Sequence, residues 1–352
     1  MNYLKFVFSG LLLFLFIGIK AQGDGKSSSF EYSCEVYEDL FGLDEALNLT
    51  LKFNIREFQK TRAEEEYHAA EMTCNANDTF QLTTPVRVKV RGIHRRDYCL
   101  MPPFWLNIRY SGIETDELMG IRRMKVVTRC RNGKSYAGYL LREYLVYKIF
   151  NLITPYSYRV RLINLKYVDT GRDNKETQDW AFLIEPDDMM AARLHARVIK
   201  EDMLAMRTVN PEVMNRLAMF QYMIGNGDYS VTGRHNLKIL AMETSVPAGF
   251  VPVPYDFDYT GLVNAHYAVP NENLGTHTVR ERYFLGPCRN RNCYDYVIRE
   301  LEGLKDEIEA LIRGFEYLEE EDRLDMIRYI ESFFKSASDE RFFEREISST
   351  CT

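Results

Sequence analysis

The sequence predicts an α+β protein with two unequal lobes, the first rich in strands and the second mainly helical. In the first half, apolar residues alternate with polar ones, which gives a strand one buried face and one solvent-facing side. In the second half, apolar residues recur every three or four positions, the period of an amphipathic helix. The pattern changes at Glu185–Pro186, so we expect the strand-rich lobe over residues 30–185 and the helical lobe over 186–348.

The N-terminus has the layout of a cleavable signal peptide. Lys5 precedes an apolar run from Phe6 to Ile19, and Ala21 offers a small residue for cleavage. We therefore expect a signal peptide over residues 1–21 and a small, polar, disordered leader over 22–29. The alternative is a retained anchor, but the run is short for a membrane span and Lys20 interrupts it. The predicted location is outside the cytoplasm, periplasmic or secreted, with no transmembrane segment after cleavage.

Charge and cysteine content narrow the class of protein further. The net charge is -6 with both signs interspersed, which argues against a nucleic-acid partner. An oxidising compartment would allow the 7 cysteines to form disulfides, with at least one left over. Cys288 and Cys293 are expected to close a small loop, and the alternative is a zinc site with His277 that has no evident fourth ligand. The second predicted pair is Cys99 with Cys130, which lie beside two candidate neighbouring strands.

The sequence pattern of the first half predicts strands and one helix. The helix is expected over Tyr139–Leu152, because Leu141, Leu145 and Ile149 fall on one face, and Pro155 ends it. Strands are expected where apolar residues alternate or form short runs, at 47–53, 86–90, 106–110, 124–128, 159–168 and 180–184.

The sequence pattern of the second half predicts helices and one β-hairpin. A helix is expected over Asp187–Arg207, and a second begins at the Asn210 cap and runs to about Ile224. Two short strands, Asn236–Leu240 and Gly249–Val253, would form a hairpin. A loop-rich stretch over 255–292 follows, and then helices over 301–315 and 322–334.

Two polar clusters flank the predicted hairpin, one ending at Asn236 and one beginning at Pro254. Since a hairpin returns its two ends to the same place, Asp228, Asn236, Asp256 and Asp258 are expected to converge. A set of oxygen ligands favours a hard cation such as Mg²⁺, Mn²⁺ or Ca²⁺. The alternative is two ordinary turns, because Asn, Asp and Gly are also turn residues.

The same two clusters resemble motifs of the CotH spore-coat kinase family, which has an atypical protein-kinase-like fold. The matching segments are Gly225-Asn226-Gly227-Asp228, His235-Asn236 and Pro254-Tyr255-Asp256-Phe257-Asp258. The resemblance implies a two-lobed protein-kinase-like fold that uses ATP or another nucleotide with Mg²⁺ or Mn²⁺. It implies that Asp228 is the catalytic carboxylate and that Asn236 and Asp256 hold the metal, with Asp258 assisting.

The resemblance extends more loosely to the first half. Arg91 to Arg96 resembles the Arg-Gly-Asn segment that covers nucleotide phosphates, although its arginines would equally suit a solvated strand end. Lys125 would bind phosphate and pair with Glu143 on the following helix, and Glu185 would lie at the hinge beside the adenine. The alternative for Lys125 and Glu143 is a solvated strand face and a solvated helix face. The chain departs from the family pattern by having no Gly-rich phosphate loop.

Two classes of function follow from these residues. The first is an exported phosphotransferase that uses a divalent-metal nucleotide on an unknown protein or small-molecule acceptor. The alternative is a non-catalytic envelope or secreted binding protein in which the cluster holds a structural cation such as Ca²⁺. A third hypothesis is an enzyme with the same kinase-like fold that transfers another group, such as AMP or an amino acid. Divalent-dependent nucleotide binding would separate the enzyme from the binding protein.

Overall fold

The computed structural model describes residues 40–351 except 43, 65, 78–79, 93, 109–121, 201–203 and 245–246. The predicted signal peptide, the predicted leader and Cys34 lie outside the described residues, as does Tyr110 of one predicted strand.

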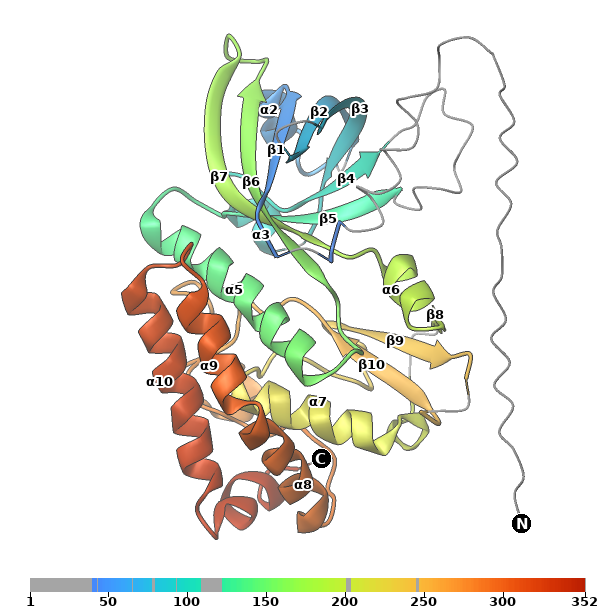
Figure 1. Ribbon diagram of the computed structural model, residues 1–352, viewed down its shortest axis with the longest axis vertical. Coiled ribbons are helices and arrows are strands. Elements are labelled where there is room, and N and C mark those ends of the chain that lie inside the picture. Colours follow the sequence, from blue (N-terminus) through green and yellow to red (C-terminus); the bar gives the residue numbers. More distant parts are fainter. Residues whose placement is uncertain are drawn as a thin grey trace, which may run out of the picture.

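Seven strands close into a barrel in the order β1-β2-β3-β4-β5-β7-β6 (Figure 1). Neighbouring strands pair antiparallel, with one exception: β1 and β6 run parallel from Leu47↔Ile163 to Phe53↔Asp169 and close the barrel. The strands are β1 (Leu47–Phe53), β2 (His68–Asn77), β3 (Phe80–Val90), β4 (Phe104–Ile108), β5 (Arg123–Thr128), β6 (Val160–Asp169) and β7 (Lys175–Ile184).

The α+β class is confirmed, but the predicted two-lobed protein-kinase-like fold is wrong. The strands form a closed seven-stranded mixed barrel, which that fold does not contain. Alternation along each strand gives its buried face, but it does not say whether the first strand pairs with a later one. Here β1 pairs with β2 on one side and with β6 on the other, so neither edge is left open.

The barrel has its own hydrophobic core. Along β1 the buried residues are Leu47, Leu49, Leu51 and Phe53, as the period-two pattern predicts. They join the inward-facing residues of the other strands and Phe58 of α2 (Ile55–Lys60) in one cluster. Fully burying one such side chain stabilises the fold by roughly 1.5–3 kcal/mol, so this alternation contributes much of what holds the barrel together.

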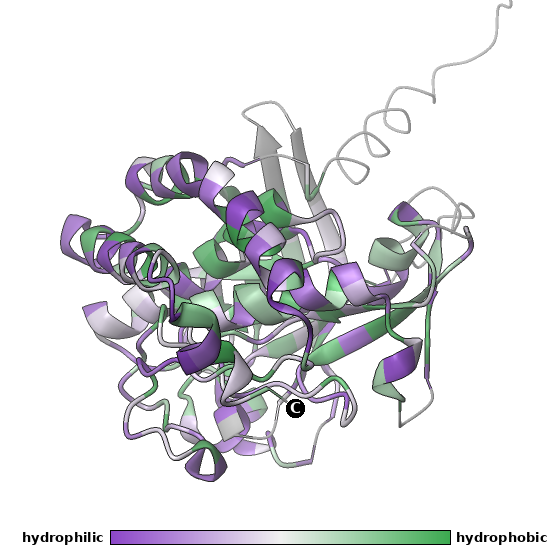
Figure 2. Cartoon of the chain, turned by 90° about the horizontal axis from the view of Figure 1, so that it is seen from below, coloured by the Kyte–Doolittle hydropathy of each residue, from purple (hydrophilic) through white to green (hydrophobic). Residues whose placement is uncertain are grey.

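The rest of the chain is mainly helical and lies at one end of the barrel (Figure 1). Helix α5 (Lys134–Ile153) contacts β6 and β7 on the barrel and α9 in the helical part. The other long helices are α7 (Pro211–Met223), α8 (Arg291–Gly303), α9 (Lys305–Gly314) and α10 (Glu320–Ala337), followed by the short π-helix η3 (Phe343–Ser348). From this end, hydrophilic and hydrophobic residues alternate along the helices, which is typical of helices that cover a core on one side only (Figure 2).

A three-stranded sheet follows β7, and it corrects one predicted helix. Instead of one helix over Asp187–Arg207, the chain forms α6 (Asp187–Arg193), β8 (Ala196–Val198) and the 3-10 turn η1 (Met206–Thr208). His195 has a φ of 50°, a left-handed backbone that a helix cannot continue through. Strand β8 pairs with β9 (Leu237–Met242), and β9 pairs with β10 (Phe250–Pro254). The β9–β10 pair confirms the predicted hairpin.

Two disulfides join parts of the chain that are distant in sequence. The predicted Cys99–Cys130 bond is confirmed. The predicted Cys288–Cys293 bond is wrong, because Cys288 pairs with Cys351 near the C-terminus and Cys293 stays a half-buried thiol in the first turn of α8. This bond also uses the thiol that the alternative zinc site required. Two disulfides fit an oxidising compartment.

Within the described parts of the chain, no helix is long and apolar enough to cross a membrane.

Candidate functional site

A small cavity of about 120 Å³ lies where the barrel, α5 and the β9–β10 hairpin meet. We name it the acidic cavity after its carboxylates. It brings together side chains from six segments of the chain, and six of the eight predicted site residues line it: Arg91, Glu143, Asp228, Asn236, Asp256 and Asp258.

Asp228 is held from three sides at the edge of the acidic cavity. Its backbone N–H donates to the Asn226 side chain at 2.8 Å. Its two carboxylate oxygens contact His235 Nε2 at 2.9 Å and Asn236 Nδ2 at 3.1 Å. The side chain is still 43% exposed, so these contacts orient the carboxylate while leaving it accessible.

The turn that carries Asp228 is joined to the segment that carries Asp258. The backbone N–H groups of Gly261 and Leu262 donate to the carbonyls of Gly225 and Ile224, both at 3.0 Å. Gly225 has a φ of 67°, and a Cβ there would lie 2.2 Å from Tyr329 Oη. Only glycine satisfies both requirements, so this position fixes how closely the two polar clusters approach.

The hairpin places Asn236 and Asp256 beside each other, as predicted. Asn236 directly precedes β9, and Asp256 is separated from the end of β10 by Tyr255 alone. The end residues of the two strands pair as Leu237↔Pro254. Both residues have positive φ values, 54° and 67°, a conformation that is uncommon outside glycine and concentrates at functional sites. The backbone N–H of Asp256 donates to Tyr147 Oη of α5 at 2.8 Å, which ties this turn to the helix.

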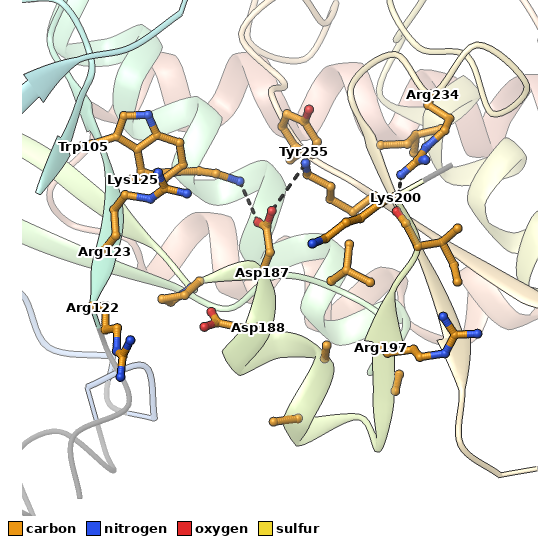
Figure 3. Close-up of a pocket in the computed structure, with 18 of the residues that line it drawn as sticks. Trp105, Arg122, Arg123, Lys125, Asp187, Asp188, Arg197, Lys200, Arg234 and Tyr255 are labelled. Carbon is orange, nitrogen blue, oxygen red and sulfur yellow. Dashed lines mark hydrogen bonds and ion pairs between the residues drawn. The ribbon is translucent and has the colours of Figure 1, made fainter. Parts of the chain in front are cut away.

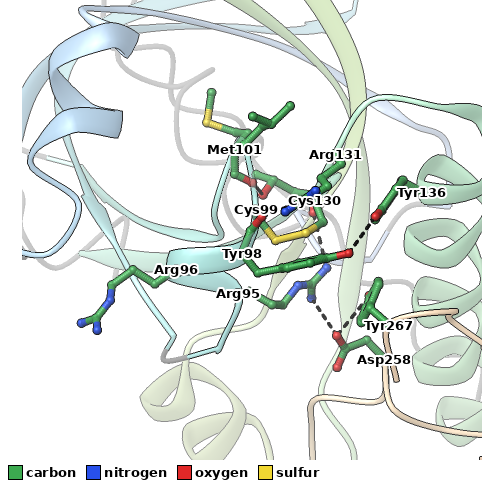
Figure 4. Close-up of a disulfide and its surroundings, with 12 residues drawn as sticks. Arg95, Arg96, Tyr98, Cys99, Met101, Cys130, Arg131, Tyr136, Asp258 and Tyr267 are labelled. Atoms are coloured by element: carbon green, nitrogen blue, oxygen red, sulfur yellow. Dashed lines mark hydrogen bonds and ion pairs between the residues drawn. A yellow bond between two sulfur atoms is a disulfide. The ribbon is translucent and has the colours of Figure 1, made fainter. Parts of the chain in front are cut away.

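Arg95 is the cation at the centre of the acidic cavity. It lies on the short helix α3 (His94–Tyr98), and its guanidinium is 3.3 Å from Glu143 and 3.7 Å from Asp258. Tyr267 donates to the same Asp258 carboxylate at 3.2 Å. The Cys99–Cys130 disulfide follows directly after α3, and Figure 4 shows it beside Arg95, whose side chain is directed at Asp258.

Burial dominates the protonation of these carboxyls. It raises the pKa of Glu143 from its ordinary value of 4.5 to about 8, although Arg95 works in the opposite direction. It likewise raises the pKa of Asp258 from 3.8 to about 7, against the lowering effect of Arg95 and with a further increase from Asp256. The cavity therefore holds more carboxylates than its cations neutralise.

These shifts predict a stability that falls as the pH rises. Both carboxyls have a higher pKa folded than unfolded, so the folded chain binds more protons between about pH 4 and 8. The stabilisation is complete below the unfolded pKa values and is lost as pH rises through the folded ones. We expect Tm to fall between pH 6 and 8.5 without divalent cations, and Glu143→Gln to flatten this slope. Glu300→Gln, at a partly exposed pair with Arg216, should not change it.

A much larger cleft of about 1260 Å³ adjoins the acidic cavity, and Tyr255 lines both. We name it the basic cleft. Its innermost cation is Lys125 of β5, whose side chain is only 7% exposed and donates to Asp187 at 2.9 Å. Lys238 approaches the same carboxylate at 3.4 Å. Figure 3 shows the side chain of Lys125 directed at Asp187. Burial lowers the pKa of Lys125, while Asp187 acts to raise it.

Two predicted roles are not what the contacts show. Lys125 does not pair with Glu143, because Lys125 contacts Asp187 and Glu143 contacts Arg95. Glu185 lines neither the cavity nor the cleft. It is fully buried, and Arg159 and Arg193 each approach it at 2.9 Å, so its carboxylate is already occupied.

Sequence reasoning missed Asp187 and Tyr147 and assigned Arg95 to phosphate rather than to carboxylates. Asp187 begins a helix directly after Pro186, where an acidic residue is common as a helix-dipole partner, so nothing singled it out. Tyr147 follows Glu143 by four residues and thus faces the same side of α5, which was the available signal.

In the described ranges, no three His, Cys, Asp or Glu side chains lie close enough together to hold a metal ion by themselves.

Comparison with known proteins adds no family. No protein-family model matches the chain. The curated proteins contain no match either. The CotH resemblance therefore stays a prediction from the motifs.

Proposed function

We propose that this protein transfers a phosphoryl group from a metal-bound nucleotide to a hydroxyl acceptor. The observation that supports this most is the meeting of Asp228, Asn236 and Asp256 at one cavity, next to a cleft that carries Lys125. Phosphoryl transfer needs positioning, positive charge on the phosphates and a carboxylate near the attacking hydroxyl. Each of these has a residue here.

The ligands for Mg²⁺ or Mn²⁺ would be Asn236, Asp256 and Asp258. The Nδ2 of Asn236 donates to Asp228, which leaves Oδ1 of the same amide for a cation. One amide and two carboxylates are hard oxygen donors of the kind that Mg²⁺ prefers, and Mg²⁺ usually takes its other ligands from water and substrate phosphates. A bound divalent cation would also neutralise the excess carboxylate charge of the cavity.

The nucleotide phosphates would enter from the basic cleft, where Lys125 lies, and Arg91 would meet them at the acidic cavity. Asp228 does not line the basic cleft, and it also lines a third cavity of about 450 Å³, together with His235 and Tyr259. An acceptor hydroxyl in that third cavity would approach Asp228 from the side opposite the phosphates. The orientation of Asp228 by His235 and Asn236 suits a carboxylate that accepts the hydroxyl proton.

Thermal melting with Mn²⁺ and ATP tests this proposal. A ligand at 100 times its Kd stabilises the folded state by about 2.7 kcal/mol, so we expect a clear rise in Tm that needs both metal and ATP. Asp256→Ala should abolish the rise, and Asp306→Ala, an exposed carboxylate on α9, should keep it.

An absence of any ATP-dependent shift with Mg²⁺ or Mn²⁺ would contradict the proposal. If Ca²⁺ alone raised Tm and nucleotide had no effect, the same residues would form a structural cation site in a binding protein.

A further inference from the structure

The basic cleft is strongly positive although the whole chain is acidic. Seven of its described lining residues are Lys or Arg and three are Asp or Glu, a net charge of +4 (seven minus three) in a chain whose net charge is -6. Its volume of about 1260 Å³ also exceeds the roughly 300–1,000 Å³ of a usual small-molecule pocket. The size and the charge both indicate an extended anion.

The cations stand on opposite walls of the cleft. Arg122, Arg123 and Lys125 come from the start of β5 and the residue before it, on the barrel side. Across from them are Arg197, Lys200, Arg234 and Lys238, which come from β8, β9 and the segments beside these strands. Figure 3 shows the two groups on either side of Asp187. A ligand between these walls would meet cations on both sides, with the Asp187 carboxylate between them already paired with Lys125 and Lys238.

The aromatic rings of the cleft are already covered by cations. Arg123 lies over the ring of Trp105 at 4.1 Å, and Arg91 lies over the same ring at 5.4 Å. Lys125 lies over the ring of Tyr255 at 4.9 Å and Lys238 at 6.0 Å. Such cation–π contacts hold the positive groups in place and occupy the faces on which a base would stack. The cleft therefore offers more to phosphates than to a nucleobase.

We propose that the basic cleft binds a linear phosphate chain without recognising a base, and that inorganic polyphosphate is the preferred donor. The donor role rests on the proposed function, because the chain end must reach the acidic cavity. In the transfer step, the acceptor oxygen forms a bond to the terminal phosphorus and the bridging P–O bond to the next phosphate breaks. The shortened chain leaves with the electron pair, and Asp228 takes the hydroxyl proton.

A series of ligands at constant ionic strength and constant Mg²⁺ tests base recognition and chain length separately. Tripolyphosphate and ATP have equal phosphate number, so we expect their Kd values to agree within about threefold if the base is not bound. A polyphosphate of about 15 phosphates should bind at least tenfold more tightly per chain than tripolyphosphate, after correction for the number of positions at which it can bind. AMP should not bind measurably.

Charge-matched variants locate the binding. Arg123→Ala/Arg197→Ala/Lys200→Ala removes three exposed cations of the cleft, and Arg299→Ala/Arg328→Ala/Lys335→Ala removes three exposed cations from α8 and α10. We expect the cleft variant to lose at least tenfold in polyphosphate affinity and the control to lose less than twofold. Equal losses would mean that only overall charge attracts the chain, and would overturn the proposed site.

The outcomes separate the donor from the reaction. If ATP binds at least tenfold more tightly than both tripolyphosphate and polyphosphate, the base is recognised and the polyphosphate proposal fails while phosphoryl transfer stands. If polyphosphate binds in the cleft but neither it nor ATP yields a metal-dependent transfer sensitive to Asp228→Asn, the phosphate-chain site stands. In that case the donor role and the proposed function both fail.

Discussion

Asp228→Asn is expected to lower the rate of phosphoryl transfer by about 10²–10⁴-fold, the usual contribution of a general base. The amide keeps the size of the side chain but cannot accept the proton of the acceptor hydroxyl. Since the acceptor is unknown, the measurement is metal-dependent release of phosphate from ATP or polyphosphate to water. The affinity for the donor should change little, because Asp228 lines the acidic cavity and does not line the basic cleft.

The matched control is Asp295→Asn, at a half-buried position on α8 that pairs with Arg291. This variant should transfer phosphate at the original rate. A normal rate in Asp228→Asn, with the fold intact by Tm, would show that another group accepts the proton.

Arg95→Met is expected to lower the free energy of unfolding by about 3–5 kcal/mol, the cost of breaking a buried ion pair by removing one partner. Glu143 and Asp258 would remain buried without the cation that contacts both. Chemical denaturation at pH 9, above the folded pKa values of both carboxyls, measures the effect. The loss should be smaller at pH 5, where both carboxyls are protonated, because burial holds their pKa values at about 8 and about 7.

Two further variants separate this effect from a general loss of packing. Lys134→Met alters a cation whose pair with Glu319 is exposed, at 95% and 75% for the two side chains, and such a pair contributes at most about 1 kcal/mol. Arg95→Met/Glu143→Leu removes one stranded carboxylate and should recover part of the stability. A double variant no more stable than Arg95→Met would contradict the ion-pair explanation.

The meeting of the two polar clusters was predictable from sequence, because it follows from the hairpin alone. The predicted strands Asn236–Leu240 and Gly249–Val253 correspond to β9 and β10, which pair antiparallel, so the residues just outside them must lie together. The Cys99–Cys130 bond was predictable for a similar reason, since both cysteines lie beside neighbouring strands.

The choice of partners within the site was not predictable. From the sequence, Lys125 and the arginines of residues 91–96 were all possible partners for Glu143. Their spacing along the chain does not say which of them lies nearest to Glu143 in the fold. The side chain of Arg95 reaches Glu143 from α3, which precedes the Cys99–Cys130 disulfide. Lys125 shares a face of β5 with Val127, which lines the acidic cavity, yet its ammonium contacts Asp187 instead. The pairing of charges between distant segments depends on how each helix or strand is rotated about its axis. The local sequence pattern does not determine that rotation.

The parallel pairing of β1 with β6 has a consequence for how the chain folds. Asn48 and Asn164 face each other across this seam, 116 residues apart. The barrel also needs β7 between β5 and β6, so it cannot close until the chain has been made as far as Ile184, about half of its length. Bringing such distant segments together costs loop-closure entropy before the contacts between them form and offset it. Folding rates therefore fall as the contacts join residues farther apart in sequence. Until β6 arrives, one edge of β1 is an unpaired strand edge, open to pairing with another chain. The stage before β1 pairs with β6 is therefore the slowest and most aggregation-prone stage of folding. A chain that ends before residue 160 lacks β6, so this edge of β1 would stay unpaired.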